Sequence, residues 1–125
     1  MHVAQVESYR NIQKASLSGR DLEAEVLSKA AYKLTYCQNN WDDPKRDEIL
    51  DEALKYNQKI WTLFQSELTR PDNPLPQKLK EDLLSLSAFI DKRIFDVMSF
   101  PSSEKLNALI NINLNIAAGL RGSSV

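Results

Sequence analysis

The five prolines of this chain fall at only three places, and each place borders a long segment that has none. Proline lacks a backbone N–H and disfavours helix at the residue before it, so it marks helix boundaries. Asp43 followed by Pro44 is typical of a helix start, with the aspartate as N-cap. The cluster at residues 71–76 predicts an extended connection, and Pro101 ends a further segment. These prolines divide the chain into helix-length pieces.

Apolar residues recur at helical spacing in each piece, and no stretch alternates strictly as a half-buried strand does. The predicted helices cover residues 20–39, 44–69, 76–99 and about 103–119. Gly119 is the expected C-terminal glycine of the last helix, and residues 121–125 are expected to fray. Residues 2–16 form a weaker helical candidate. Its thin apolar stripe consists of Val3, Val6, Tyr9 and Ile12.

The length of 125 residues allows one hydrophobic core. The prediction is therefore an all-α chain, a single-domain helical bundle spanning residues 1–125. It has four principal helices plus a short N-terminal helix.

Composition argues against an enzyme. The chain has one histidine, His2, and one cysteine, Cys37, which excludes a Cys/His zinc site and leaves no base to activate a serine. Three glycines leave no phosphate-cradling loop. We therefore expect no catalytic residue, no metal and no cofactor, and we interpret the chain as a binding module.

Charge and hydropathy narrow the expected location. Sixteen basic and seventeen acidic residues give a net charge of −1, which offers no general attraction to nucleic acid or acidic membranes. The longest uncharged stretch, residues 106–120, is too short and too rich in asparagine to span a bilayer. Charges spread through residues 1–20 argue against a secretory signal. We expect a cytoplasmic protein without membrane insertion.

The last three predicted helices carry more apolar residues than a narrow bundle seam requires. One interpretation is that one helix is central in the bundle; the other is that some of this surface accepts another protein's apolar helix. The candidate partner-binding residues lie outside the tightest stripes and are Trp61, Leu84, Phe95, Met98, Ile112 and Leu114.

Asparagines occupy two unusual settings. Asn57 and Asn113 sit in apolar stripes, so each needs a partner: the backbone or each other in the core, or a bound protein's backbone in a groove. Asn107, Asn111 and Asn115 share the outer face of the last helix, where charged residues are usual. Such an uncharged face suits contact with another protein, although a merely solvated face is the alternative.

Three segments, residues 57–61, 73–79 and 109–120, resemble the FlaF family of flagellar biosynthesis proteins. The family shows Asn-x-x-Leu-Trp, then Asn-x-Leu-Pro, then a closing Leu-Ile-x-Val-Asn-x-x-Ile-x-x-Gly-Leu, and the chain has a similar segment for each, in the same order. The matching structural positions are Asn57, Leu75, Pro76, Asn113, Gly119 and Leu120. Four residues differ from those usual in the family but keep their size class or charge. They are Ile60, Glu67, Lys80 and Phe89.

The resemblance implies a cytoplasmic protein that binds flagellin, supports its secretion, and acts with FlbT to control flagellin production after transcription. The expected ligand is the amphipathic terminal helices of flagellin. The alternatives are a structural flagellar component and a regulator that binds flagellin mRNA directly. The basic residues available for RNA, Lys78, Lys80, Lys92 and Arg93, are interleaved with acidic ones, so we expect no direct nucleic-acid contact.

Overall fold

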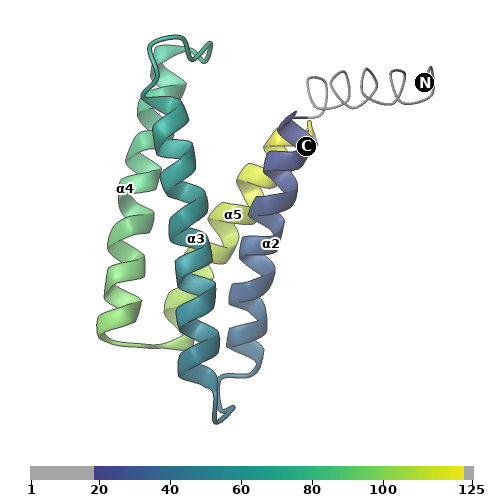
Figure 1. Cartoon of the computed structure of the whole chain (residues 1–125), viewed down its shortest axis with the longest axis vertical. Coiled ribbons are helices and arrows are strands. Elements are labelled where there is room, and N and C mark those ends of the chain that lie inside the picture. The colour runs from purple at the N-terminus through teal and green to yellow at the C-terminus, as the bar shows by residue number, and fades with distance from the viewer. Residues whose placement is uncertain (1–18, 123–125) are drawn as a thin grey trace, which may run out of the picture.

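The computed structural model describes residues 19–122, and this part of the chain is all-α. Its helices are α2 (Gly19–Asn39), α3 (Arg46–Leu68), α4 (Gln77–Ser99) and α5 (Leu106–Leu120), with a 3₁₀ turn, η1 (Ser103–Lys105), before α5. Figure 1 shows the four helices running alternately down and up. The four principal helices are thus confirmed, whereas the predicted helix at residues 2–16 lies outside the described residues.

The predicted start of α3 is two residues too early. Asp43 is not its N-cap: its carboxylate accepts a hydrogen bond from the Lys45 amide at 2.7 Å, and its carbonyl accepts one from the Arg46 amide at 2.8 Å. Pro44 therefore lies in a turn that Asp43 closes, and the helix begins after it at Arg46.

The predicted end of α5 needs a similar correction. Gly119 is part of the helix, and the glycine with left-handed backbone is Gly122, at φ 72°. Arg121 does not fray, because its amide bonds to the Ala117 carbonyl and its guanidinium donates to the Ser28 hydroxyl at 3.0 Å.

Hydrogen bonds between side chains fix how the helices align. α5 runs antiparallel to α2, with Gln38 bonded to Asn107 at 2.7 Å near one end and Arg121 bonded to Ser28 near the other. α3 lies beside α2 through the Lys33–Glu52 ion pair at 2.8 Å. α4 packs on α3, where the Gln65 amide donates to Ser87 and, at 3.0 Å, to Asp91.

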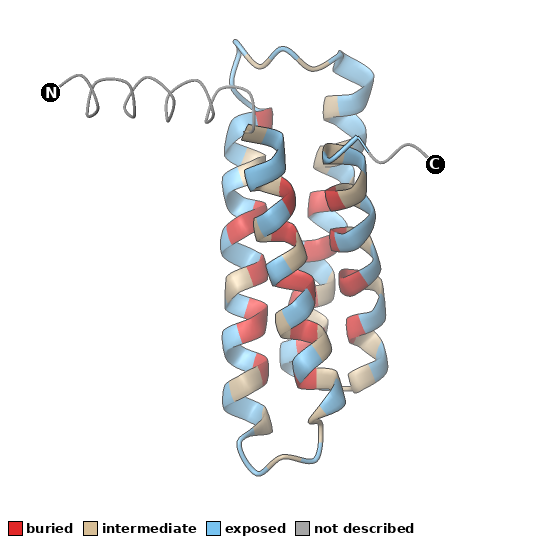
Figure 2. Cartoon of the chain, turned by 90° about the vertical axis from the view of Figure 1, so that its right-hand side faces the viewer, coloured by how far each residue is buried: buried red, intermediate tan, exposed pale blue. Residues whose placement is uncertain are grey.

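Burial is uneven along α4. Its buried residues all lie at or after Ser87 and are Ser87, Ile90, Ile94 and Val97. Figure 1 shows α4 and α5 close together at their connection and diverging from there, with α5 inclined toward α2. In Figure 2 the buried residues line the inner faces of the helices. The core is therefore well covered near the α4–α5 connection and less covered at the opposite end.

A buried chain of hydrogen bonds joins α2, α3 and α5. The Asn57 side-chain amide donates to the carbonyls of Ala30, at 3.2 Å, and Ala53, at 2.8 Å. The Asn113 amide donates to Asn57 Oδ1 at 2.6 Å, and Trp61 Nε1 donates to Asn113 Oδ1 at 2.8 Å. Both asparagines are completely buried. The interpretation that they bond the backbone and each other in the core is confirmed.

Removing one member of this chain should destabilise the fold strongly. Asn113→Ala leaves the Trp61 N–H and the Asn57 carbonyl oxygen buried without partners, so the free energy of unfolding should fall by about 3 kcal/mol. Asn111→Ala, at an exposed position of the same helix, should change it by no more than about 0.5 kcal/mol. Urea denaturation followed by circular dichroism measures both, and equal stabilities of the two variants would contradict a structural role for Asn113.

Candidate functional site

Trp61, one of the predicted partner-binding residues, lies in the core. Only 1% of its surface is exposed, its indole N–H bonds to Asn113, and its ring packs edge-on against Phe64 with the centroids 5.6 Å apart. The apolar band of α3 is wide, and helical spacing alone does not show which part of it is buried. Leu50, Leu54 and Trp61 are buried, while Leu63 is 54% exposed.

The three candidates on α4 share one flank. At 100° per residue, Leu84, Phe95 and Met98 lie on the side that also carries Asp91, which bonds to Gln65 of α3. Phe95 is 72% exposed and Met98 is 43% exposed, whereas Leu84 is half-buried. This flank is therefore an edge of the α3–α4 pair with one prominent aromatic residue.

The candidates on α5 are divided between two flanks. Asn107 and Leu114 lie on the side toward α2, where the Asn107 oxygen accepts the bond from Gln38. Ile112 lies on the opposite side and packs partly against the core. Asn111 and Asn115 are exposed between these flanks, on the outer face. The nine predicted partner-binding residues therefore do not form one continuous surface.

Half-buried apolar side chains occur on α3, α4 and α5, mostly toward the end of the bundle where α4 and α5 are far apart. These side chains are large, and most of them pack partly against the buried core. They are Phe64 of α3, Leu83 and Leu86 of α4, and Ile112, Ile116 and Leu120 of α5. We call this set the uncovered apolar end.

Apart from Ile112, the sequence prediction did not name these residues as candidates for a partner. The surplus of apolar residues on the last three helices did indicate that some apolar surface could stay uncovered. Spacing within one helix does not show whether a neighbouring helix covers a given side chain, so the residues left half-buried could not be identified from it.

Carboxylates lie beside this end of the bundle. Glu23, in the first turns of α2, lies near both Arg20 and Glu67. Burial raises the pKa of the Glu23 carboxyl above its usual value, an effect that Arg20 opposes and Glu67 reinforces. Glu67 also forms an ion pair with Arg70 at 3.7 Å, so the charges between α2 and α3 at this end are mixed.

The groove between α2 and α3 has a different character. Tyr32 and Tyr36 are exposed along it, and the ammonium groups of Lys29 and Lys33 lie 5.7 and 5.2 Å from the Tyr56 ring centre. Lys33 also forms the ion pair with Glu52. Its cations thus already have partners within the protein.

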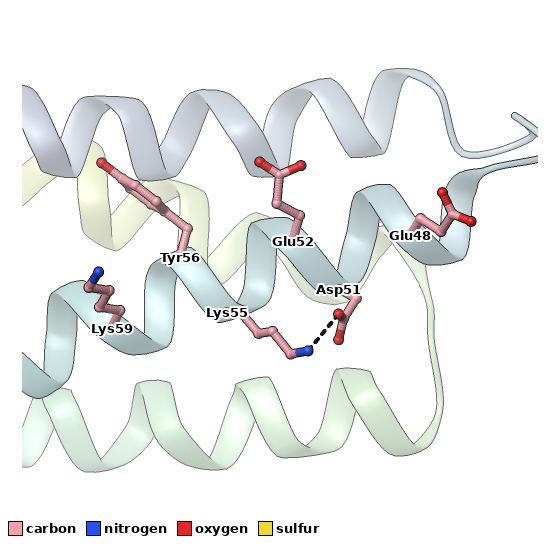
Figure 3. A pocket seen from close by; sticks show the side chains of 6 residues that line it. All are labelled: Glu48, Asp51, Glu52, Lys55, Tyr56 and Lys59. Atoms are coloured by element: carbon pink, nitrogen blue, oxygen red, sulfur yellow. Dashed lines mark ion pairs between the residues drawn. The ribbon is translucent and has the colours of Figure 1, made fainter.

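A shallow depression on α3 adjoins this groove. Figure 3 shows Glu52 and Tyr56 directed toward α2, with Lys55 and Asp51 paired on the other side at 2.9 Å. Glu48 and Lys59 complete its lining. Mixed charges and internal pairing make this an ordinary solvated helix face.

Two of the four basic residues considered for RNA contact are engaged within the protein. Lys78 pairs with Asp82 at 3.0 Å, and the Arg93 guanidinium lies 5.3 Å from the centre of the Phe89 ring. Nothing in the described surface favours the RNA alternative over the protein-binding one.

Two further features bear on the site. Cys37 is fully buried, and burial raises the pKa of its thiol, so it is a small core residue. In residues 19–122, no helix combines the length and hydropathy needed to cross a membrane.

The motif residues have structural roles in this arrangement. Asn57, Trp61 and Asn113 form the buried hydrogen-bond chain. Asn73 shapes the turn before α4, since its amide donates to the Glu67 carbonyl at 2.9 Å and its oxygen accepts from the Leu75 amide at 3.0 Å.

The described part is thus a small all-α bundle with a polar hydrogen-bond chain in its core and an apolar end left partly uncovered. The chain belongs to the FlaF family, because the family model for the flagellar protein FlaF matches residues 5–120. Comparisons with curated proteins and with solved structures found no match. Family membership gives the protein a role in flagellar biogenesis.

The raised pKa of Glu23 has a consequence for stability. Its folded-state pKa lies above the unfolded one, so the folded state binds more protons in this range and stability falls as the pH rises through it. Glu23→Gln should therefore raise the free energy of unfolding at pH 7, by less than about 1 kcal/mol because the carboxyl is partly solvated. The gain should disappear as the pH falls below the usual carboxyl pKa. Thermal melts of both proteins between pH 3.5 and 7.5 test this, and a difference independent of pH would contradict it.

Proposed function

We propose that the protein binds flagellin in the cytoplasm as a secretion chaperone and, with FlbT, takes part in post-transcriptional regulation of flagellin synthesis. It acts by binding rather than by catalysis. The observation that carries the proposal is the uncovered apolar end in a member of the FlaF family. Terminal segments of flagellin are amphipathic helices that are buried only in the filament. Before export, their apolar faces therefore need to be covered by another protein.

The geometry of the uncovered apolar end suits a helix. Ile112, Ile116 and Leu120 follow one another at intervals of four residues, which makes a stripe about 12 Å long on one flank of α5. Leu83 and Leu86 of α4 and Phe64 of α3 are half-buried apolar residues as well. An amphipathic helix that presents apolar residues at i, i+4 and i+7 matches this arrangement.

The border of this surface supports reversible binding. Asn111 and Asn115 are exposed next to Ile112 and Ile116 on the outer face of α5, a helix without any charged residue. Side-chain amides bond a partner without the desolvation cost of a charge. Ordering of the bound segment consumes part of the interaction energy, which favours release when flagellin is exported.

Binding to flagellin should depend on the uncovered apolar end and not on other exposed apolar residues. Ile116→Asp should weaken the affinity for purified flagellin monomers by about 10- to 100-fold, because it places a charge in the proposed contact. Phe95→Asp is the matched control, since it adds the same charge at a residue that is more exposed but lies on the other flank of α4. Isothermal titration calorimetry measures both affinities, and circular dichroism verifies that each variant is folded.

A second pair of variants tests the border. Asn111→Lys together with Asn115→Lys should spare folding and reduce affinity, and flagellin lacking its terminal segments should bind neither the variant nor the wild type.

Unchanged affinity in Ile116→Asp, or equal losses in Ile116→Asp and Phe95→Asp, would overturn this assignment of the surface.

A further inference from the structure

The outer face of α5 differs from the exposed faces of the other described helices because it carries no charge. α5 contains no lysine, arginine, aspartate or glutamate, whereas α2, α3 and α4 each carry charges of both signs. It therefore presents hydrogen-bonding groups and apolar surface without any fixed charge. Its exposed residues are Asn107, Asn111, Leu114, Asn115 and Gly119.

A face of asparagines is complementary to a copy of itself. Each side-chain amide has both a donor and an acceptor, so it pairs with another amide in either role. In a two-fold contact the same face lies on both sides, so a charged face sets like charges against each other. The outer face of α5 avoids this repulsion, and Leu114, which is 46% exposed, adds an apolar contact. Of the described helices, α5 is therefore the one best suited to pair with a second copy.

Small residues allow two such helices to approach closely. At 100° per residue, Ala118 lies on the same face as Asn111, and Gly119 lies on its flank. Beyond the adjoining backbone, no atom lies within 4 Å of the point where a side chain on Gly119 would begin. The backbone of α5 is thus open at this point, and a side chain of an opposing helix has room to lie on it.

Charges at the two ends of α5 specify an antiparallel pair. Glu104 in η1 precedes the helix, Arg121 follows it, and both are exposed. Neither forms an ion pair within residues 19–122. In an antiparallel pair Glu104 of each copy lies near Arg121 of the other, whereas a parallel pair brings like charges together. The register that aligns these ends places Asn111 of one copy across from Asn115 of the other, with Leu114 near the two-fold axis.

We propose that the free protein forms a symmetric dimer in which two α5 helices pack antiparallel through their outer faces. The contact is about 22 Å long, the length of fifteen helical residues, and is smaller than the interface of an obligate dimer. The dimer is therefore reversible, with a dissociation constant of about 10–100 μM, and the asparagines stay accessible in the monomer. This inference goes beyond the proposed function. Its test uses this protein alone, so its outcome does not depend on flagellin.

Two double variants that differ at one residue test the pairing. Asn111→Lys with Asn115→Lys sets like charges against each other across the proposed contact. Asn111→Glu with Asn115→Lys sets opposite charges against each other, and a glutamate four residues before a lysine is also favourable within one helix. Sedimentation equilibrium of the full chain and both variants, from about 10 μM to about 1 mM protein, measures the dissociation constants. Circular dichroism verifies that each variant is folded.

The expected result is a wild-type dimer whose dissociation constant rises by about 10-fold or more in the Lys/Lys variant and by no more than about threefold in the Glu/Lys variant. A wild type that stays monomeric up to about 1 mM would overturn the dimer. Equal dissociation constants in all three proteins would overturn the α5 contact. Equal losses in both variants would overturn the antiparallel arrangement, because a parallel pair sets like charges against each other in each of them.

Discussion

The hydrogen-bond chain from Trp61 through Asn113 and Asn57 to the Ala30 carbonyl determines how three of the helices fit together. Inside an apolar core each of these groups is costly without a partner, so a shift of one helix by a single residue would leave several unpaired. Apolar contacts alone tolerate such shifts far better. The chain therefore gives α2, α3 and α5 one register, in the way that a core asparagine does in coiled coils.

α4 does not take part in this chain. It is attached to α3 by the Gln65 hydrogen bonds and by the apolar residues of its second half, and no residue of α4 before Ser87 is buried. The hydrogen-bonded three-helix unit and the less buried α4 thus differ in how they are held. Phe64, Leu83 and Ile116 stay half-buried.

Much of the fold was predictable from local signals. Prolines located the connections, and burial cost predicted that Asn57 and Asn113 need partners. For the candidate site, the sequence predicted the kind of surface, an apolar one on the last three helices, but not the residues that form it. Trp61 was assigned to a partner surface because its indole partner, Asn113, lies 52 residues away in the chain and is not visible as a neighbour in the sequence. The half-exposure of Phe64 likewise depends on how far α4 and α5 diverge, which results from contacts between distant segments and not from the residues around position 64.

The uneven attachment of α4 also bears on how free energy is distributed through the molecule. The residues that unfold together in small fluctuations are those with few buried contacts, so the first turns of α4 can open and reclose while the rest of the bundle stays intact. A surface bordered by such a segment adjusts its width at little cost. Under the proposed function, such a surface would accept partner helices with leucine, phenylalanine or methionine at the same positions, so one small protein would serve several closely related partner sequences.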